Sequence, residues 1–278
     1  MPTSEKLIRI GCQSWGYDDW VTKADGPPVF YPRGTKHPEM LEQYARLLST
    51  VEVDSTAYGT PQEATLEGWL EQVPADFLFS LKVPSVITHE YSLDERSFEQ
   101  MSEFCDRARM LADRLGVILI QLPASFEPTK PNAQRLREFT ERLPPDIKFA
   151  VEFRAQGWFV DWTIEELNDA SVALAMVEGP WVGRDVMFAS LPLLRTPHAY
   201  LRIMGERDLV KFDRVYRNRN EQLELWSERI SQIAAREIYI YADNQYEGHA
   251  PATVNKLSRL LELPVFDPSE IEAQASLF

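Results

Sequence analysis

Ionisable residues lie at the ends of several short apolar runs in this sequence, and four of them could perform acid/base chemistry together. They are Glu52, Lys82, Glu152 and Arg202. A carboxylate can accept a proton, and a neighbouring lysine or arginine can stabilise the negative charge that develops in a reaction. We therefore predict that these four residues form a catalytic group, in which either carboxylate accepts a proton and the two cations stabilise charge.

Other polar and aromatic residues lie at or just after the ends of the apolar runs and are candidates for ligand binding. Aromatic rings stack on sugars or bases, while amides and carboxylates bind hydroxyl groups. The candidates are Gln13, Ser14, Trp15, Asp54, Tyr58, His89, Gln121, Arg154, Asp243 and Asn244. In the alternative interpretation, the rings only pack loops onto the protein, and the buried charges only pair with one another.

The pattern gives less support to metal or nucleotide chemistry. The four histidines form no H-x-x-H or H-x₃-H pair and the two cysteines are far apart, so we predict no zinc site and no cofactor. Oxygen ligands suit Mg²⁺ or Mn²⁺, so an ion of this kind at the acidic residues stays an open alternative. Neither a G-x-S-x-G nucleophile motif nor a phosphate-binding P-loop motif is present.

The elements that must position these residues alternate along the chain. Strands are predicted at 7–12, 50–54, 77–83, 117–122, 148–153, 172–177, 198–203 and 237–242. Helices are predicted at 38–48, 98–115, 131–143, 221–235 and 252–261, and Thr60 and Thr163 read as the caps of two more.

This alternation favours a parallel sheet covered by helices, and we predict one (β/α)₈ TIM-type barrel domain over residues 1–278. An open doubly wound sheet is the alternative, but the G-x-G-x-x-G turn that such a sheet favours is absent after the first strand. In a barrel, the carboxyl ends of the strands meet at one mouth, where the residues above would converge.

Composition and charge narrow the class of partner. Apolar residues make up 44% of the 278 positions, and the net charge of −14 argues against a nucleic-acid partner. The basic stretch 211–219 could bind nucleic acid locally, and a solvated loop is the alternative. No apolar run approaches the roughly twenty residues of a membrane span, and no export signal is visible, so we predict no membrane partner and a cytoplasmic location.

Six sets of motifs occur in a fixed order between residues 8 and 261. They are Ile10-Gly11-Cys12-Gln13-Ser14-Trp15, Phe30-Tyr31-Pro32, Val51-Glu52-Val53-Asp54-Ser55-Thr56-Ala57-Tyr58, Phe77-Leu78-Phe79-Ser80-Leu81-Lys82-Val83-Pro84 with Ile87-Thr88-His89, Gln121-Leu122-Pro123 and Val151-Glu152-Phe153-Arg154. Together they resemble the YecE-like family, domain of unknown function number 72. The resemblance implies a cytoplasmic TIM-type barrel without an established activity, similar in outline to apurinic endonucleases and sugar isomerases.

The chain departs from the pattern of that family at four polar positions. Asp54 and Asp243 each replace a usual asparagine, and Met204 and Gln245 replace usual histidines. A mechanism that needs those histidines does not carry over. We expect an enzyme that acts on a polar, sugar-like or phosphorylated small molecule by acid/base chemistry at the barrel mouth. The alternative is a barrel that binds a ligand or nucleic acid without turnover.

Overall fold

A computed structural model describes residues 6–269, and within this range the chain forms one closed barrel of eight parallel strands. The strands are β1 (Leu7–Gln13), β2 (Thr50–Val53), β3 (Leu78–Lys82), β4 (Leu115–Gln121), β5 (Lys148–Glu152), β6 (Ala173–Glu178), β7 (His198–Ile203) and β8 (Glu237–Ala242). They pair in chain order, and β1 closes the barrel by pairing with β8. The predicted TIM-type barrel is confirmed. The prediction that residues 1–278 form a single domain stays a prediction, because it also covers residues 1–5 and 270–278, which lie outside the described range.

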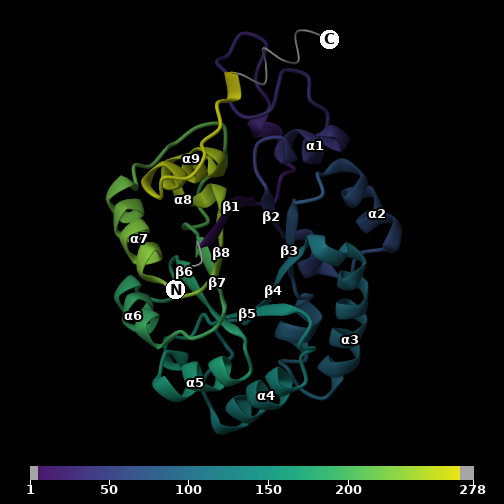
Figure 1. Ribbon diagram of the computed structural model, residues 1–278, viewed down its shortest axis with the longest axis vertical. Coiled ribbons are helices and arrows are strands. Elements are labelled where there is room, and N and C mark those ends of the chain that lie inside the picture. The colour runs from purple at the N-terminus through teal and green to yellow at the C-terminus, as the bar shows by residue number, and fades with distance from the viewer. Residues whose placement is uncertain (1–5, 270–278) are drawn as a thin grey trace, which may run out of the picture.

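Helices fill the connections and surround the strands (Figure 1). They are α1 (Met40–Ala45), α2 (Glu63–Gln72), α3 (Arg96–Ala108), α4 (Lys130–Glu141), α5 (Asp161–Asp169), α6 (Arg184–Ser190), α7 (Asn220–Gln232), α8 (Asn244–Glu247) and α9 (Ala250–Leu260). The helix predicted at 98–115 continues beyond α3 only as a 3₁₀ segment, Arg109–Arg114, in which Ala112 has a φ of 49°. None of the helices in the described range is long and apolar enough to cross a membrane.

Two predicted helix starts are wrong. Helix α2 begins at Glu63 and not after Thr60, because the chain stays extended through Gln62. A tertiary contact holds this stretch, since Arg107 Nη1 donates to the Pro61 carbonyl at 2.8 Å. Helix α5 begins at Asp161, so Thr163 lies inside it and is buried against the core instead of capping it. Packing has overridden both local capping signals.

The barrel interior is partly polar. The Tyr241 hydroxyl on β8 lies 2.8 Å from Thr50 Oγ1 on β2 and 2.8 Å from Ser80 Oγ on β3. Nearer the amino ends of the strands, Lys148 Nζ lies 2.6 Å from Glu237 Oε2. Buried polar groups cost free energy unless they are hydrogen-bonded. These contacts provide the hydrogen bonds that polar side chains inside the barrel need.

The loops after β7 and β8 are held together by close backbone approach. A β-carbon on Gly205 would lie 2.0 Å from the Gln245 carbonyl oxygen, so only glycine lets these loops meet. Gly248, with a φ of 107°, ends α8 in the left-handed region. The buried carboxylate of Glu247, the last residue of α8, accepts from Lys256 Nζ at 2.7 Å and helps to hold α8 against α9.

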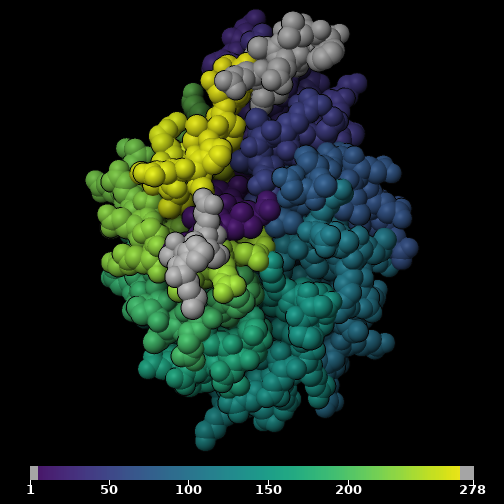
Figure 2. All heavy atoms as spheres, in the orientation of Figure 1, coloured from purple at the N-terminus to yellow at the C-terminus, as the bar shows by residue number. Residues whose placement is uncertain are grey.

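Segments from both ends of the described chain lie side by side in the region of α1 and α9 (Figure 2). The rings of Phe30 and Phe266 have their centres 5.3 Å apart. Asn255 on α9 donates to the Phe266 carbonyl at 2.7 Å and accepts from its N–H at 3.0 Å. The C-terminal segment therefore covers the same side of the barrel as the connection between β1 and α1.

Candidate functional site

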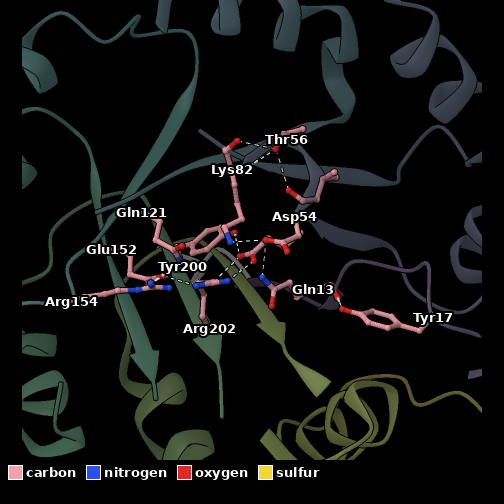
Figure 3. Close-up of polar contacts among 12 residues, drawn as sticks. Gln13, Tyr17, Asp54, Thr56, Lys82, Gln121, Glu152, Arg154, Tyr200 and Arg202 are labelled. Carbon is pink, nitrogen blue, oxygen red and sulfur yellow. Dashed lines mark hydrogen bonds and ion pairs between the residues drawn. The ribbon is translucent and has the colours of Figure 1, made fainter. Parts of the chain in front are cut away.

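Charged residues from different strands meet inside the carboxyl end of the barrel (Figure 3). Arg202 on β7 lies between Glu52 on β2 and Glu152 on β5. Its Nη2 is 2.7 Å from Glu52 Oε1, its Nη1 is 2.5 Å from Glu152 Oε2, and its Nε donates to Glu52 Oε2 at 2.9 Å. All three side chains are fully buried. We call these three residues the buried charge cluster.

Neighbouring side chains complete the bonding of the buried charge cluster. The Tyr200 hydroxyl donates to Glu52 Oε2 at 2.6 Å. Gln121 Nε2 lies 3.0 Å from both Glu152 oxygens, and Arg154 Nε lies 3.0 Å from Glu152 Oε1. Every carboxylate oxygen in the cluster therefore accepts at least one hydrogen bond, as buried charges require.

This bonding controls protonation. Burial alone would raise the pKa of Glu152, but Arg202 and Arg154 outweigh it and hold this pKa at about 2. Burial would lower the pKa of Arg202, yet the two carboxylates hold it well above its ordinary value. Both Glu152 oxygens are also buried and already bonded, so neither is free to accept a proton from a substrate. The geometry therefore does not favour the proton-acceptor role that we predicted for Glu152, and Glu52 is held by the same arginine.

Lys82 and Asp54 form a second ion pair nearer the solvent. Lys82 Nζ lies 2.6 Å from Asp54 Oδ1, and 6% of the lysine side chain is exposed against 41% of the aspartate side chain. Gln13 Nε2 donates to the same oxygen at 3.2 Å. Burial raises the pKa of Asp54, but Lys82 lowers it more, so this carboxylate stays ionised. Within residues 6–269 no hydrogen bond uses Asp54 Oδ2, which leaves that oxygen for a ligand.

A second carboxyl group flanks the end of β1. Asp54 follows β2 and Asp243 follows β8, and β1 pairs with both of these strands. Asp243 caps α8 by accepting from the Gln245 N–H at 3.2 Å, and burial raises its pKa. The Tyr17 hydroxyl donates to the Gln13 carbonyl at 3.4 Å at the end of β1, and its pKa is raised by burial and then by Asp243 and Asp54. The two acids and the phenol thus share one side of the mouth.

Positive charge gathers on the β3 to β5 side. His89 lies in a partly buried π-helical turn, Val86–Glu90, and burial followed by the cations Arg154 and Lys82 lowers its pKa. This histidine is therefore mostly neutral at neutral pH. The guanidinium carbon of Arg154 lies 5.0 Å from the ring centre of Trp181, in the loop after β6. The mouth is consequently acidic on one side and basic on the other.

Four of the predicted ligand-binding residues form no hydrogen bond or ion pair with the charged side chains described above. Tyr58 is 89% exposed on the surface, and Trp15 packs edge-on against a tryptophan of α2. The Ser14 N–H donates to a β2 carbonyl at 2.8 Å, with a φ of 62°. Asn244 is buried, and its side-chain oxygen accepts from an indole N–H at 3.1 Å. Trp15 thus agrees better with the loop-packing alternative, Tyr58 is too exposed for that role, and Asn244 holds an indole in place.

Sequence reasoning missed Thr56, Tyr17, Tyr200 and Trp181. Tyr200 precedes Arg202 by two residues on β7 and so faces the same side, a signal that strand parity could have supplied. The Thr56 hydroxyl donates to the Lys82 carbonyl at 2.8 Å and accepts from its N–H at 2.9 Å, fixing the lysine backbone. The roles of Tyr17 and Trp181 depend on loop conformation, which has no comparable sequence pattern.

Two alternatives from the sequence can be set against the geometry. In the part of the chain that the structure describes, no group of three His, Cys, Asp or Glu residues lies close enough to hold a metal ion. In the basic stretch 211–219, Arg217 lies 3.0 Å from Glu206 and also pairs with Asp208, and Arg219 lies 3.4 Å from Glu206. Two of the four cations in this stretch are therefore paired with acids outside it.

The fold and the charged mouth define a TIM-type barrel with a polar site at the carboxyl ends of its strands. Residues 9–275 match the family model of "Protein of unknown function DUF72". The chain belongs to the DUF72 family, as its motifs suggested.

Comparisons with individual proteins agree with this assignment. The chain is 32% identical over 153 residues to the UPF0759 protein YecE of Escherichia coli K12, an alignment that covers 55% of this chain and 50% of YecE. The chain thus spans about half the length of the curated relatives it matches. A DUF72 crystal structure from Thermotoga maritima is similar with 25% identity and a TM-score of 0.74, covering 92% of this chain and all but 1% of the other. One from Enterococcus faecalis, at 21% identity and a TM-score of 0.71, covers 94% and 100% and shows the fold alone.

Proposed function

We propose that this protein is an enzyme that acts on a polar, sugar-like or phosphorylated small molecule by acid/base chemistry at the barrel mouth. The observation that carries the proposal is the ion pair between Lys82 and Asp54. A nearly buried ammonium holds a carboxylate that is 41% exposed on its side chain, and one carboxylate oxygen has no partner within the described chain. Such a carboxylate can bind a substrate hydroxyl directly.

The reacting groups in this proposal differ from the buried charge cluster. Asp54 accepts a proton, the Lys82 ammonium stabilises the negative charge that develops, and Asp243 returns a proton. Their environments support this division, because the pKa of Asp54 is lowered by Lys82 and that of Asp243 is raised by burial. Two carboxyl groups with opposite shifts are the usual arrangement for an acid and a base. The buried charge cluster positions the strand ends beneath them.

Deuterium exchange tests the proposal without knowledge of the product. The wild-type protein is incubated in D₂O with a panel of sugars, sugar phosphates and hydroxy acids, and deuterium in carbon-bound positions is measured by mass spectrometry. We expect incorporation into at least one compound and its loss in Asp54→Asn and Lys82→Met. Glu67→Gln on the exposed face of α2 is the matched control.

The outcomes separate catalysis from simple binding. Exchange that survives both substitutions would exclude this acid/base pair. Binding of a panel compound, seen by calorimetry, without exchange would favour the alternative of a barrel that binds without turnover. The cytoplasmic location stays a prediction that cell fractionation can test.

A further inference from the structure

Arg154 has unused hydrogen-bonding capacity at the mouth. Its side chain is only 15% exposed, and its Nε lies 3.0 Å from Glu152 Oε1. Across residues 6–269, no hydrogen bond reaches Arg154 Nη1 or Nη2. A guanidinium offers its donors in a fixed planar fork that matches the two oxygens of a carboxylate or a phosphate. Two donors of this fork are therefore left for a molecule that is not part of the chain.

Glu152 bonds this arginine through Nε alone. Its other oxygen is 2.5 Å from Arg202 Nη1, Gln121 bonds both oxygens, and Arg202 also pairs with Glu52. These four charges balance overall, so the attraction for an anion is local, at the two Nη groups of Arg154 that no carboxylate of the described residues bonds. Burial lowers the pKa of His89, and the cations Arg154 and Lys82 lower it further. The effect of the two cations indicates a positive potential on this side. An anionic group is electrostatically favoured here.

Trp181 fixes one face of the Arg154 guanidinium. The guanidinium carbon lies 5.0 Å from the ring centre, and the indole is 50% exposed, in a loop between Gly179 and Gly183. Stacking on an indole restricts the guanidinium plane without using its N–H donors. The tryptophan therefore orients the fork and provides an apolar wall beside it.

The other place where barrels of this fold often bind phosphate is blocked. That place is the amino end of a short helix after β8, and here it is occupied by the carboxylate of Asp243, which caps α8. The Asp243 oxygen already accepts from the Gln245 N–H, the backbone donor that an oxyanion would need there. Figure 3 shows Arg154 and Asp54 on either side of Arg202, so an anionic group at Arg154 would lie away from the acidic side of the mouth.

We propose that Arg154 and Trp181 form a subsite for a two-oxygen oxyanion, either a carboxylate or a phosphate, at one end of a small polar substrate. The Arg154 fork binds the oxyanion, and the sugar-like remainder extends towards Asp54 and Lys82. This inference rests on the proposed function, because it assigns the charged end of the same substrate.

The test compares three ligands that share one carbon skeleton with inorganic phosphate, which has none. Glucose, gluconate, glucose 6-phosphate and inorganic phosphate are titrated into wild type, Arg154→Gln, Arg154→Lys and Trp181→Leu by calorimetry. The matched control is Arg137→Gln, which removes an exposed arginine on α4. We expect oxyanion affinity to fall at least about tenfold in Arg154→Gln, the equivalent of one charge-assisted hydrogen bond. Arg154→Lys restores part of the affinity, Trp181→Leu weakens it, and the control does not change it.

The two oxyanion sources are distinguished by whether gluconate or glucose 6-phosphate binds more tightly, and either preference supports the subsite. Failure of the wild type to bind any oxyanion in the set, or equal affinity in wild type and Arg154→Gln, overturns it. Should Arg154→Gln not fold, Trp181→Leu decides the question, because this half-exposed ring leaves the buried charges untouched.

The outcome for the subsite can be distinguished from the outcome for the proposed function. Arg154-dependent oxyanion binding without deuterium exchange would keep the subsite and reject the enzyme. Exchange that depends on Asp54, with oxyanion binding indifferent to Arg154, would do the reverse.

Discussion

Arg202 is the residue on which the buried charges depend, because it bonds both carboxylates of the cluster at once. The three atoms of its guanidinium that contact Glu52 and Glu152 lie at 2.5–2.9 Å, in a region from which water is excluded. The desolvation of three charges is costly, so such a group persists only when its geometry is good and its hydrogen bonds are complete.

Removing this arginine should destabilise the fold strongly. We expect Arg202→Met to lower the free energy of unfolding by about 3–5 kcal/mol, because Glu52 is left buried without its cation. Urea unfolding followed by circular dichroism measures the change. Arg137→Met, which breaks an exposed pair with Glu166, should cost about 0–1 kcal/mol. A loss of similar size in both variants would contradict the importance of the cluster.

At the residue scale, barrel closure was enough to predict that Glu52, Glu152 and Arg202 meet, but not that Lys82 pairs with Asp54 instead of joining them. Glu52 and Arg202 are 150 positions apart, yet each lies at the carboxyl end of a parallel strand, where side chains converge. The chemical role of each residue could not be predicted in this way. Whether Asp54 or Glu52 faces the solvent depends on a few ångströms of depth, and the orientation of Trp181 depends on the conformation of one loop.

Among the elements, the contact between the loops after β7 and β8 sets the positions of two strand ends in the site. A methyl group at Gly205 would collide with the Gln245 carbonyl, whereas one at Gly183, before α6, would meet nothing within 4 Å. These glycines form a matched pair, because both lie in loops at the same end of the barrel.

We expect Gly205→Ala to lower the free energy of unfolding by about 1–3 kcal/mol, the usual cost of forcing an extra carbon into a packed site. Gly183→Ala should leave it nearly unchanged. Thermal unfolding of both variants provides the measurement. Equal melting temperatures for the two alanine variants would show that the loop contact can relax freely.

His249, at the junction of α8 and α9, should make stability depend on pH. It is buried against Trp20, and burial lowers its pKa from 6.5 to about 4. The unfolded chain therefore binds a proton as the pH falls below 6.5, while the folded chain does not until about pH 4. Stability is full above pH 6.5 and is lost progressively down to about pH 4.

Replacing His249 with phenylalanine removes this proton linkage and keeps a ring of similar size. The difference in unfolding free energy between His249→Phe and wild type should change, in favour of the variant, by up to about 3 kcal/mol across this range. Urea unfolding at a series of pH values measures it. A constant difference at every pH would mean that His249 titrates normally in the folded protein.

The elements themselves could largely be predicted from the sequence. β7 and β8 have the predicted bounds, because each is a short run of mainly aliphatic and aromatic residues, as strands covered on both faces require. Helix starts were less predictable, because Thr60 and Thr163 carry local capping signals that tertiary packing overrides. Helix α6 lies within 180–197, where the sequence showed no convincing period, because its buried face is short.

At the scale of the whole molecule, charge should dominate encounters with polyanions. The net charge is −14, and two arginines of the basic stretch, Arg217 and Arg219, are paired with acids. We expect no binding of single- or double-stranded DNA at physiological ionic strength, measured by fluorescence anisotropy of a labelled oligonucleotide. Affinity that falls steeply with added salt and is lost on charge reversal at Arg217 and Arg219 would contradict this expectation.

The hydroxyl groups inside the barrel have a further consequence. Val117 N–H donates to Ser80 Oγ, and Thr50 Oγ1 donates to the Leu78 carbonyl. Each hydroxyl has one proton, so the bonds through Tyr241 can run in only one direction, from Ser80 to Tyr241 to Thr50. Such a directed relay polarises cooperatively, and its span is set by bond lengths and not by the volumes of packed side chains. The three hydroxyls therefore link β2, β3 and β8 across the barrel interior beneath the mouth.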